Sequence, residues 1–548
     1  MKTLVSLIQQ SIQECWELPA LSNYKGDNYT FGAIAIAIKQ QHYLFETLGV
    51  EKGDKVALMG KNSAKWAISY LAAVTYGAVI VPILPDFKVE DATRIVHHSD
   101  AKVLIIEKFI FEQMEVEGMP LLQAVMDVAD FNPLYQKTEI LDLGALPAEK
   151  MLQDFPLGYH AADVQYAETQ PDDLAVISYT SGTTGFSKGV MIPHRSLTGN
   201  VVFARENMPL ERGNKIMSFL PLAHTYGCAF EFLFPFTRGC HITFLTKTPA
   251  PKIIMMAFAE VKPHLILSVP LVIEKIYKSQ ILPALEDSKT KMMLKVPLLN
   301  KLVHKKIREK LTQVFGGNFK ELIIGGAAFN AEAEAFFKEI KFPFTVGYGM
   351  TECGPLIGYA SWNNTVLGGS GRPVDALEVK IDSENPREVV GEILCRGGHV
   401  MQGYYKNPEA TADTIDKDGW LHTGDLGIMD EQGNILIKGR SKSLILGPSG
   451  KNIYPEELES LLMNLPYVGE ALVVDRSGKL CALIYPDYVE TEKANLSIPQ
   501  IHDIYKEHLK VVNTKVPKYM QLKMVEVQQE AFEKTPKKNI KRFLYQSK

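Results

Sequence analysis

Apolar and polar positions in the N-terminal part of the chain alternate between strand-like and helix-like periods. Short apolar runs at 55–59, 79–82 and 102–106 predict buried strands, and the longer periodic segments 64–76 and 89–98 predict helices between them. Strands that alternate with helices are typical of a parallel sheet covered by those helices. The pattern therefore predicts an α/β fold, and a second layer of the same kind is expected farther along the chain.

The character of the sequence changes near Gly368. Short alternating strands, such as 390–396 and 434–439, are separated by glycine turns, which favours an antiparallel, barrel-like unit. Farther on, Pro455 followed by two acidic residues indicates the start of a helix, and two more strands are expected to meet near Gly478. The sequence thus predicts a small final domain of mixed helices and strands.

Composition and charge narrow the class of protein. The 548 residues are 46% apolar and 22% charged, as in ordinary globular proteins, and 59 basic against 63 acidic residues give a net charge of -4. This balance gives no electrostatic case for binding nucleic acid. The six cysteines are scattered, without the paired spacing of zinc sites or disulfide frameworks, which indicates reduced thiols and a cytoplasmic location.

Two apolar stretches bear on membrane insertion. The N-terminal run is interrupted by Gln9 and Gln10 and places its apolar residues on one helix face, so a helix is expected there and not a signal peptide. The most apolar segment, 66–84, contains polar residues, a glycine and a proline, and is predicted to be a buried helix followed by a strand. No transmembrane anchor is expected.

Residues 178–190, SYTSGTTGFSKGV, carry the strongest chemical signal. The core from Thr180 to Gly189 contains five hydroxyls, three glycines and Lys188. Glycines let backbone N–H groups approach a ligand, hydroxyls add hydrogen bonds and lysine adds positive charge, a combination that suits a polyphosphate. The segment is expected to connect two strands, unlike the P-loop, which ends in Gly-Lys-Ser/Thr before a helix. A flexible surface linker is the alternative, but it would lack the flanking strands and the lysine.

With this loop the chain resembles the AMP-forming adenylating enzymes, the family that contains acyl-CoA synthetases, peptide-synthetase adenylation domains and luciferases. The resemblance continues in order along nearly the whole chain. Its further segments are LPLAHTYG (220–227), GGAAF (325–329), GYGMTECGP (347–355), GYYKNPEAT (403–411), GWLHTGDLG (419–427) and GRSKSLILGPSGKNIYPEELE (439–459).

The resemblance implies that a carboxylate attacks the α-phosphorus of ATP and that pyrophosphate leaves. A site for this reaction must hold a triphosphate, neutralise its charge with a metal and orient the attacking oxygen. Glu352 is implied to bind Mg²⁺, and Thr351 to contact the α-phosphate. The residues implied to grip the β- and γ-phosphates are Thr180, Ser181, Gly182, Thr183, Thr184, Gly185 and Lys188.

The resemblance also implies contacts to the nucleoside and the acid. Asp425 would accept hydrogen bonds from both ribose hydroxyls, with Arg440 beside it, and His224 would lie near the carboxylate and the acyl pocket. Taken singly, Glu352, His224 and Asp425 also fit an acid in the first turn of a helix, a core histidine and a turn residue. Their joint occurrence in family order favours the functional interpretation. The residues implied at the adenine are Gly325, Gly326, Ala327, Tyr348 and Gly349.

In the family, a small C-terminal domain rotates between the two half-reactions, and the hinge corresponds to Lys442. The loop 447–452 would then enter the site and line the pantetheine channel, although a plain turn before Pro455 explains the same residues. With the hydrophobic pattern, this predicts an α/β protein of two domains. The N-terminal domain, 1–438, has two layered α/β subdomains and a distorted antiparallel β-barrel, and the small mobile C-terminal domain, 439–548, is α+β.

The segment 269–311 bears on the choice of acid. It is longer than a small-acid ligase would need and resembles the corresponding region of long-chain fatty acyl-CoA synthetases, some of which place a tryptophan gate where this chain has Ile273. Residues 274–310 contain ten basic and four acidic residues, a net charge of +6, interleaved with apolar residues. Such a segment can lie on an anionic bilayer, and a solvated basic helix over the core is the alternative.

The last motif, FEKTPKKNIKR, departs from the family pattern. The family lysine that bridges the acyl carboxylate and the α-phosphate falls at Asn539, which donates hydrogen bonds but carries no charge. Lys538 is the predicted replacement, because a lysine stem is long and its ammonium group makes no strict angular demand. Lys537 and Lys541 are weaker candidates, and a solvated basic tail is the alternative.

These features predict a long-chain fatty acid–CoA ligase (AMP-forming) that uses Mg²⁺, ATP, a fatty acid and CoA. A close alternative is an acyl-AMP ligase or acyl-ACP synthetase, whose acceptor is a pantetheine on an acyl carrier protein. An acyl-adenylate-binding protein with little turnover would follow from loss of the terminal lysine, and a phosphate-loop hydrolase is more distant because no Walker pattern is present. Peripheral contact of residues 274–310 with the inner face of the membrane is a further expectation.

Overall fold

The chain divides into two compact units. The first comprises Met1–Thr180, Ser187–Glu378 and Cys395–Leu421, and the second Ser181–Phe186, Val379–Leu394 and His422–Lys548. The second unit therefore includes strands of the predicted barrel as well as the final domain, and the division at residue 438 stays a prediction. The computed structural model describes residues 3–138, 142–180, 187–247, 249–447, 450–535 and 539–546.

An eight-stranded sheet in the first unit has the strand order β20-β9-β8-β4-β3-β5-β6-β7. The central strands β8, β4, β3, β5 and β6 run parallel to one another. At the edges, the pairs β20-β9, β9-β8 and β6-β7 are antiparallel. The strands are β3 (Lys55–Met59), β4 (Val79–Ile83), β5 (Ala101–Ile106), β6 (Ala124–Asp127), β7 (Pro133–Gln136), β8 (Leu174–Thr180), β9 (Lys188–Pro193) and β20 (Gly403–Tyr404).

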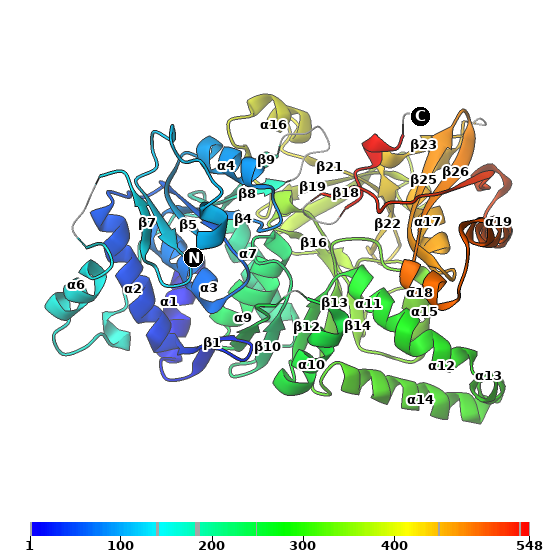
Figure 1. Cartoon of the computed structure of the whole chain (residues 1–548), viewed down its shortest axis with the longest axis horizontal. Helices are drawn as coiled ribbons and strands as arrows, with labels where there is room; N and C mark the ends of the chain where they lie inside the picture. The colour runs from blue at the N-terminus through cyan, green and yellow to red at the C-terminus, as the bar shows by residue number, and fades with distance from the viewer. Residues whose placement is uncertain are drawn as a thin grey trace. The chain divides into compact units, whose positions relative to one another are not determined.

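The helices beside this sheet begin and end where the sequence predicts. Helix α3 (Ala64–Tyr76) begins after Ser63, whose hydroxyl caps the helix, and ends at Gly77, which has φ +86°. Every residue of the neighbouring strand β4 is buried, as expected for a parallel strand covered on both faces. Helices α2 and α3 lie side by side and α3 packs on β3 and β4 (Figure 1). The predicted α/β architecture of this part is confirmed.

A seven-stranded sheet forms the second layer, in the order β14-β13-β12-β10-β11-β1-β2. All neighbours are parallel except the edge pair formed by β1 and β2. Parallel strands present their carboxyl ends at one edge, so the loops after β10, β12, β13 and β14 share that edge. The strands are β1 (Pro19–Asn23), β2 (Asn28–Thr30), β10 (Lys215–Ser218), β11 (His241–Phe244), β12 (Leu265–Ser268), β13 (Glu321–Ile324) and β14 (Phe344–Val346).

A long helical segment connects β12 to β13. Part of it is wound as a π-helix, Tyr277–Ile281. Within the described residues, no helix is both long and apolar enough to cross a membrane. The helices of the segment are α11 (Pro270–Ile276), α12 (Leu282–Glu286), α13 (Ser288–Leu294) and α14 (Pro297–Val314). The other helices of this unit include α1 (Leu4–Glu14), α2 (Phe31–Thr47), α4 (Val89–His98), α6 (Leu146–Asp154), α7 (His194–Asn207), α8 (Thr225–Gly227), α9 (Phe234–Thr237), α10 (Pro251–Val261), α15 (Ala331–Glu339) and α16 (Pro408–Thr414).

Among the described residues, two sheets of more than two strands have strands in the second unit. The strands predicted as a barrel form a four-stranded sheet in the order β18-β19-β21-β22, and the final domain has the three-stranded sheet β25-β26-β27 packed against α17 and α19. Strands β25 and β26 meet at Ser477 and Gly478, both with positive φ, as predicted for a tight hairpin turn. The elements are β18 (Leu377–Asp382), β19 (Gly391–Gly397), β21 (Leu421–Met429), β22 (Ile435–Arg440), α17 (Pro455–Met463), β25 (Val468–Arg476), β26 (Lys479–Pro486), α19 (Ile498–Lys515) and β27 (Met524–Val527).

Candidate active site

The predicted phosphate loop connects the antiparallel strands β8 and β9. Thr180, the last residue of β8, lies opposite Lys188, the first residue of β9, and the Thr180 hydroxyl donates to the Lys188 carbonyl at 3.4 Å. Both ends of the loop are therefore fixed by the sheet, which a flexible linker would not be. The other predicted members of the loop, Ser181, Gly182, Thr183, Thr184 and Gly185, lie outside the described residues.

Lys188, Tyr404 and Glu352 form one cluster in the first unit. The pairing of β20 with β9 places Tyr404 beside Val190, and the ammonium of Lys188 lies 4.6 Å from the centre of the Tyr404 ring. The Tyr404 hydroxyl donates to Glu352 Oε1 at 2.9 Å. Burial and the Glu352 carboxylate raise the pKa of Tyr404, so its hydroxyl stays a hydrogen-bond donor. The carboxylate of Glu352 and the ammonium of Lys188 thus both contact the side chain of Tyr404.

Glu352 and Thr351 are held by a tight turn, the 3₁₀ helix Thr351–Cys353. A Cβ atom on Gly349 would lie 2.2 Å from the Pro355 carbonyl oxygen, and one on Gly354, which has φ +59°, would lie 2.2 Å from Ser196 Oγ. Gly349 therefore cannot be replaced without moving the backbone, and a side chain at Gly354 would strain its positive φ and displace the Ser196 hydroxyl. The buried Asn200 of helix α7 spans the turn, donating to the Cys353 carbonyl at 3.2 Å and accepting from the Leu356 N–H at 2.9 Å.

Tyr226 of the LPLAHTYG segment joins that segment to the GGAAF segment. Its hydroxyl donates to the Ile323 carbonyl at 3.1 Å, and a Cβ atom on Gly325 would lie 3.1 Å from its ring. Gly326 has φ +88° and is exposed, as is Ala327, so the backbone after β13 is open to a ligand. Tyr348, predicted on the other side of the adenine, is buried and begins the short strand β15 (Tyr348–Gly349) in the same unit.

His224 caps the short helix α8. Its Nδ1 accepts from the Tyr226 N–H at 3.2 Å. Glu231, which lies in the π-helix Cys228–Leu233, supports the loop that carries His224. Glu231 Oε2 accepts from the Ser218 hydroxyl at 2.9 Å and from the N–H groups of Phe219 and Leu220 at 3.0 and 2.9 Å. Complete burial raises the pKa of Glu231 well above its usual value.

In the second unit, Asp425 and Arg440 lie directly opposite each other on β21 and β22. Arg440 Nε is 3.1 Å from Asp425 Oδ1, and the Asp425 side chain is 8% exposed against 69% for that of Arg440. The pair thus combines a nearly buried carboxylate, held by the sheet, with an exposed guanidinium group. Lys442, the predicted hinge, lies in the 3₁₀ helix Ser441–Ser443 that follows β22, and its side chain is exposed.

The loop predicted to line the pantetheine channel is the tip of a small hairpin. Strands β23 (Ile445–Leu446) and β24 (Asn452–Ile453) are antiparallel, and the Gly447 N–H donates to the Lys451 carbonyl at 2.9 Å. Pro448 and Ser449 lie outside the described residues.

Thr535 and Asn539, the described residues on either side of 536–538 in the terminal motif, are hydrogen-bonded to each other. The Thr535 N–H donates to the Asn539 carbonyl at 2.8 Å, and Asn539 N–H donates to the Thr535 hydroxyl at 3.3 Å. Lys541 pairs with Glu533 and Arg542 pairs with Glu459, so these two residues do not form the solvated basic tail considered above. The predicted Lys538 and its neighbour Lys537 lie outside the described residues.

Sequence reasoning missed three residues that support this site: Tyr404, Glu231 and Asn200. Tyr404 stands in the quoted segment GYYKNPEAT, but nothing in the sequence says that β20 adds to the edge of the β9 sheet. Glu231 had one signal, a single acid within the apolar run CAFEFLFPF, because a lone acid in such a run is buried and must be hydrogen-bonded. Asn200 gave no signal in the sequence.

Comparison with known proteins places the chain in a family. Residues 8–405 match the AMP-binding enzyme family. The chain is 30% identical over 473 residues to the long-chain-fatty-acid–CoA ligase FadD15 of Mycobacterium bovis, covering 80% of this chain and 74% of that protein. It is 27% identical to the long-chain-fatty-acid–[acyl-carrier-protein] ligase AEE15 of Arabidopsis thaliana, covering 82% and 71%.

A solved structure agrees with this assignment at the level of the fold. The anthranilate CoA ligase AuaEII, in complex with anthranoyl-AMP, superimposes with a TM-score of 0.78 at 20% identity over 99% of this chain and 96% of that one. The chain belongs to the AMP-binding enzyme family. It is an AMP-forming ligase that makes a thioester, as predicted.

Proposed function

We propose that the protein is a long-chain fatty acid–CoA ligase. The observation that carries this proposal is the similarity to FadD15 along 80% of the chain, which includes the helical segment between β12 and β13. In the first half-reaction, a carboxylate oxygen bonds to the α-phosphorus of ATP and pyrophosphate leaves with the electrons of the broken bond. In the second, the CoA thiol displaces AMP and loses its proton.

The cluster around Tyr404 is proposed to hold the triphosphate. Lys188 would contact the β- and γ-phosphates together with the loop Thr180–Gly185, and Thr351 would contact the α-phosphate. Glu352 fits Mg²⁺, because a single carboxylate leaves coordination positions for phosphate oxygens and water. When bound, Mg²⁺ would offset charge on the departing pyrophosphate. Tyr404 would fix the direction of the Glu352 carboxylate.

The nucleoside contacts are proposed from the same motifs. The backbone of Gly325–Ala327, exposed at Gly326 and Ala327, and the residues Tyr348 and Gly349 would enclose adenine. Asp425 would accept from both ribose hydroxyls with Arg440 beside it. The nearly buried Asp425 carboxylate supports this role, since an acceptor held by the sheet needs little reordering when it binds a diol.

The acid is proposed to bind near His224, with its chain directed toward helix α11. Ile273, at the position of the family's tryptophan gate, is completely buried in α11, so the gate is not part of the proposal. For the thioester step, we propose that domain 439–548 rotates about Lys442 relative to domain 1–438. This rotation would bring the loop 447–452 to the acid site.

The acceptor thiol has two candidates. CoA is favoured by the name of the relative with 30% identity, and the relative AEE15 is named for an acyl carrier protein. Six free cysteines support a reducing compartment, for which we propose the cytoplasm. One experiment separates the possibilities: a panel of carboxylic acids incubated with ATP and Mg²⁺, without acceptor, with CoA and with acyl carrier protein, followed by mass spectrometry. Acyl-AMP without any thioester would leave the acyl-AMP ligase alternative. Absence of acyl-AMP would leave the acyl-adenylate-binding protein with little turnover, and ADP as product would contradict the proposal.

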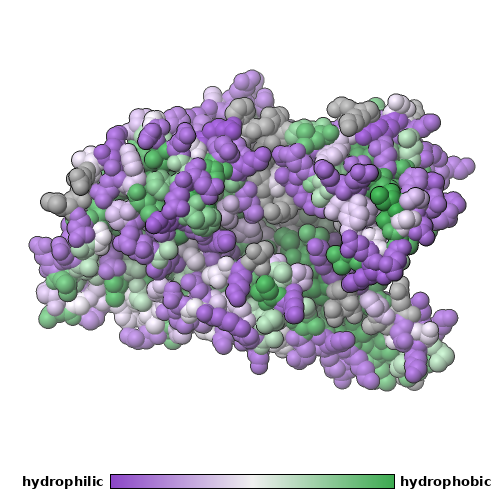
Figure 2. Space-filling view, viewed as in Figure 1, coloured by the Kyte–Doolittle hydropathy of each residue, from purple (hydrophilic) through white to green (hydrophobic). Residues whose placement is uncertain are grey.

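We further propose that helices α13 and α14 contact an anionic bilayer. Their outward side carries apolar residues that solvent reaches, such as Met292 (68% exposed) and Leu302 (54%), and charged and apolar residues alternate over this region (Figure 2). Val303 and Leu311 are buried and attach α14 to the unit from its other side. Exposed apolar residues with lysines around them suit the boundary between lipid headgroups and acyl chains. The exposed lysines around them are Lys289, Lys291, Lys295, Lys301, Lys305 and Lys306.

A further inference from the structure

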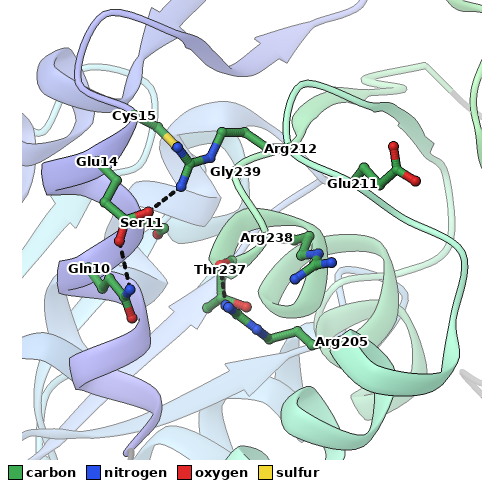
Figure 3. A pocket seen from close by; sticks show the side chains of 10 residues that line it. All are labelled: Gln10, Ser11, Glu14, Cys15, Arg205, Glu211, Arg212, Thr237, Arg238 and Gly239. Atoms are coloured by element: carbon green, nitrogen blue, oxygen red, sulfur yellow. Dashed lines mark hydrogen bonds and ion pairs between the residues drawn. The ribbon is translucent and has the colours of Figure 1, made fainter.

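A pocket of about 300 Å³ opens in the first unit and shares no residue with the proposed active site. Its walls come from the end of helix α1, the end of helix α7, the loop before β10 and the end of helix α9 (Figure 3). Three of the side chains that line it are arginines, Arg205, Arg212 and Arg238.

The acidic residues of the pocket are neutralised by other partners. Glu14 forms an ion pair with Arg212 and accepts a hydrogen bond from Gln10 at 2.6 Å, along the α1 wall. Glu211 forms an ion pair with Lys320 at 3.4 Å, and its side chain is 72% exposed. Each of the two carboxylates is thus paired with a cation. Arg205 and Arg238 are the two remaining arginines of the pocket.

Arg205 and Arg238 are half-buried, and the hydrogen-bond acceptors described for their guanidinium groups are neutral backbone carbonyls. Arg205 donates to the Thr237 carbonyl, and Arg238 Nε donates to the Leu210 carbonyl at 3.0 Å. Within the described part of the chain, neither forms an ion pair with a carboxylate. Burial and the neighbouring Arg238 both lower the pKa of Arg205, and Glu14 offsets part of this effect from across the pocket. Two cations thus lie close together in a partly desolvated place, an arrangement that an anion would stabilise.

We propose that this pocket binds a phosphate monoester or free phosphate between Arg205 and Arg238. Each guanidinium still has N–H groups beyond those used for the carbonyls, and a planar fork of such donors matches the geometry of phosphate oxygens. In Figure 3 the two guanidinium groups lie on the same side of the pocket, across from Glu14 and Gln10. The volume exceeds what one phosphate fills, so an organic remainder would lie along the Gln10 wall. The site is distinct from the phosphate loop of the proposed function and does not depend on it.

The test uses the full-length chain in the Lys188→Ala background, which weakens the phosphate loop. Titration calorimetry and ³¹P line broadening are measured with inorganic phosphate and, separately, glycerol phosphate at constant ionic strength. Arg205→Gln and Arg238→Gln should each weaken binding by about tenfold, the usual loss for one charge-assisted hydrogen bond. The matched control is Arg94→Gln, which removes an exposed arginine of the same unit and should leave the affinity unchanged. Tighter binding of glycerol phosphate than of phosphate would identify the monoester as the ligand class.

Saturable binding that both glutamine variants keep at parental affinity, or no saturable binding in the Lys188→Ala background, would overturn the proposal. A second measurement needs no variant at the pocket and so does not depend on its folding. Phenylglyoxal modifies accessible arginines, and peptide mass spectrometry of the unaltered chain reports each one. Phosphate should slow the modification of Arg205 and Arg238 and leave that of Arg94 unchanged, and equal rates with and without phosphate would contradict the site.

Discussion

The hydroxyl of Tyr404 donates to Glu352 Oε1 at 2.9 Å, although 52 residues separate them in the chain. The contact exists because β20 pairs with β9 and the Met401 N–H donates to the Glu352 carbonyl at 2.8 Å. The same ring lies under the ammonium of Lys188. One tyrosine therefore links the predicted metal ligand to the predicted phosphate ligand.

Replacing Glu352 by Gln should lower adenylation by at least about 100-fold, because a group that offsets charge on the departing pyrophosphate is lost. The measurement is fatty-acid-dependent ATP–pyrophosphate exchange. Tyr404→Phe is the matched control: it keeps the carboxylate and the ring but removes one hydrogen bond, so a smaller loss of about tenfold is expected. Near-parental exchange by the Glu352→Gln variant would remove Glu352 from the metal site.

Glu231 is predicted to act as a positioning residue for the loop that carries His224. Glu231→Ala leaves a buried hydroxyl and two N–H groups without their acceptor, so we expect a loss of about 3 kcal/mol or more in unfolding free energy and a raised KM for the acid. Burial raises the Glu231 pKa and so disfavours the charged form, and glutamine keeps an oxygen acceptor without the charge. Glu231→Gln should therefore keep most of the parental melting temperature and KM. If the Gln variant is as impaired as the Ala variant, the negative charge is required and this account is wrong.

Lys538→Ala should separate the two half-reactions. If Lys538 supplies the charge that Asn539 lacks, the variant should release pyrophosphate at least about 100-fold more slowly while still forming thioester from supplied acyl-adenylate. Lys541→Ala is a matched control, because Lys541 is engaged by Glu533. Equal retention of both activities by the Lys538 variant would mean that another group supplies the charge.

Membrane contact through α13 and α14 should depend on their exposed lysines. Each lysine near an anionic surface contributes about 1 kcal/mol, so changing Lys291, Lys295, Lys301 and Lys305 to glutamate should abolish co-sedimentation with phosphatidylglycerol vesicles. The control changes four exposed lysines elsewhere in the unit and should bind as the parent does. Unchanged sedimentation of the first variant would refute the contact. The control lysines are Lys61, Lys88, Lys108 and Lys137.

Glu321, at the start of β13, should make stability depend on pH. It is fully buried and accepts from the Tyr359 hydroxyl and the Trp362 N–H, both at 2.6 Å, and burial raises its pKa to about 7. The folded protein then holds a proton that the unfolded chain has lost, so stability should fall as the pH rises from the usual glutamate pKa, about 4.3, through about 7. The size is at most about 4 kcal/mol. Melting temperatures at about pH 5 and about pH 8 should differ less in Glu321→Gln than in the parent, and equal differences would contradict the assignment.

Periodicity and turn chemistry were enough to predict several strands and helices of the N-terminal half, namely β3, α3, β4, α4 and β5. The run 55–59 and the segment 64–76 match β3 and α3 because a parallel strand buried on both faces and a helix between capping residues each leave a local pattern. The hairpin turn at Ser477 and Gly478 was predictable for the same reason, since its geometry is set by two adjacent residues. Family motifs then indicated Glu352, Asp425 and the other candidate residues.

Only the tertiary structure showed what holds those residues. The sequence by itself predicted which segments would carry phosphate, metal and ribose chemistry. The residue types of the loop 178–190 indicated phosphate directly, and the family resemblance implied the metal and ribose residues. The sequence did not determine that Tyr404 supports Glu352, that Glu231 lies beneath the His224 loop, or that Arg205 and Arg238 share a pocket. These contacts depend on strand register, helix packing and burial between distant segments, and no local pattern of residues encodes which distant partner a side chain will meet.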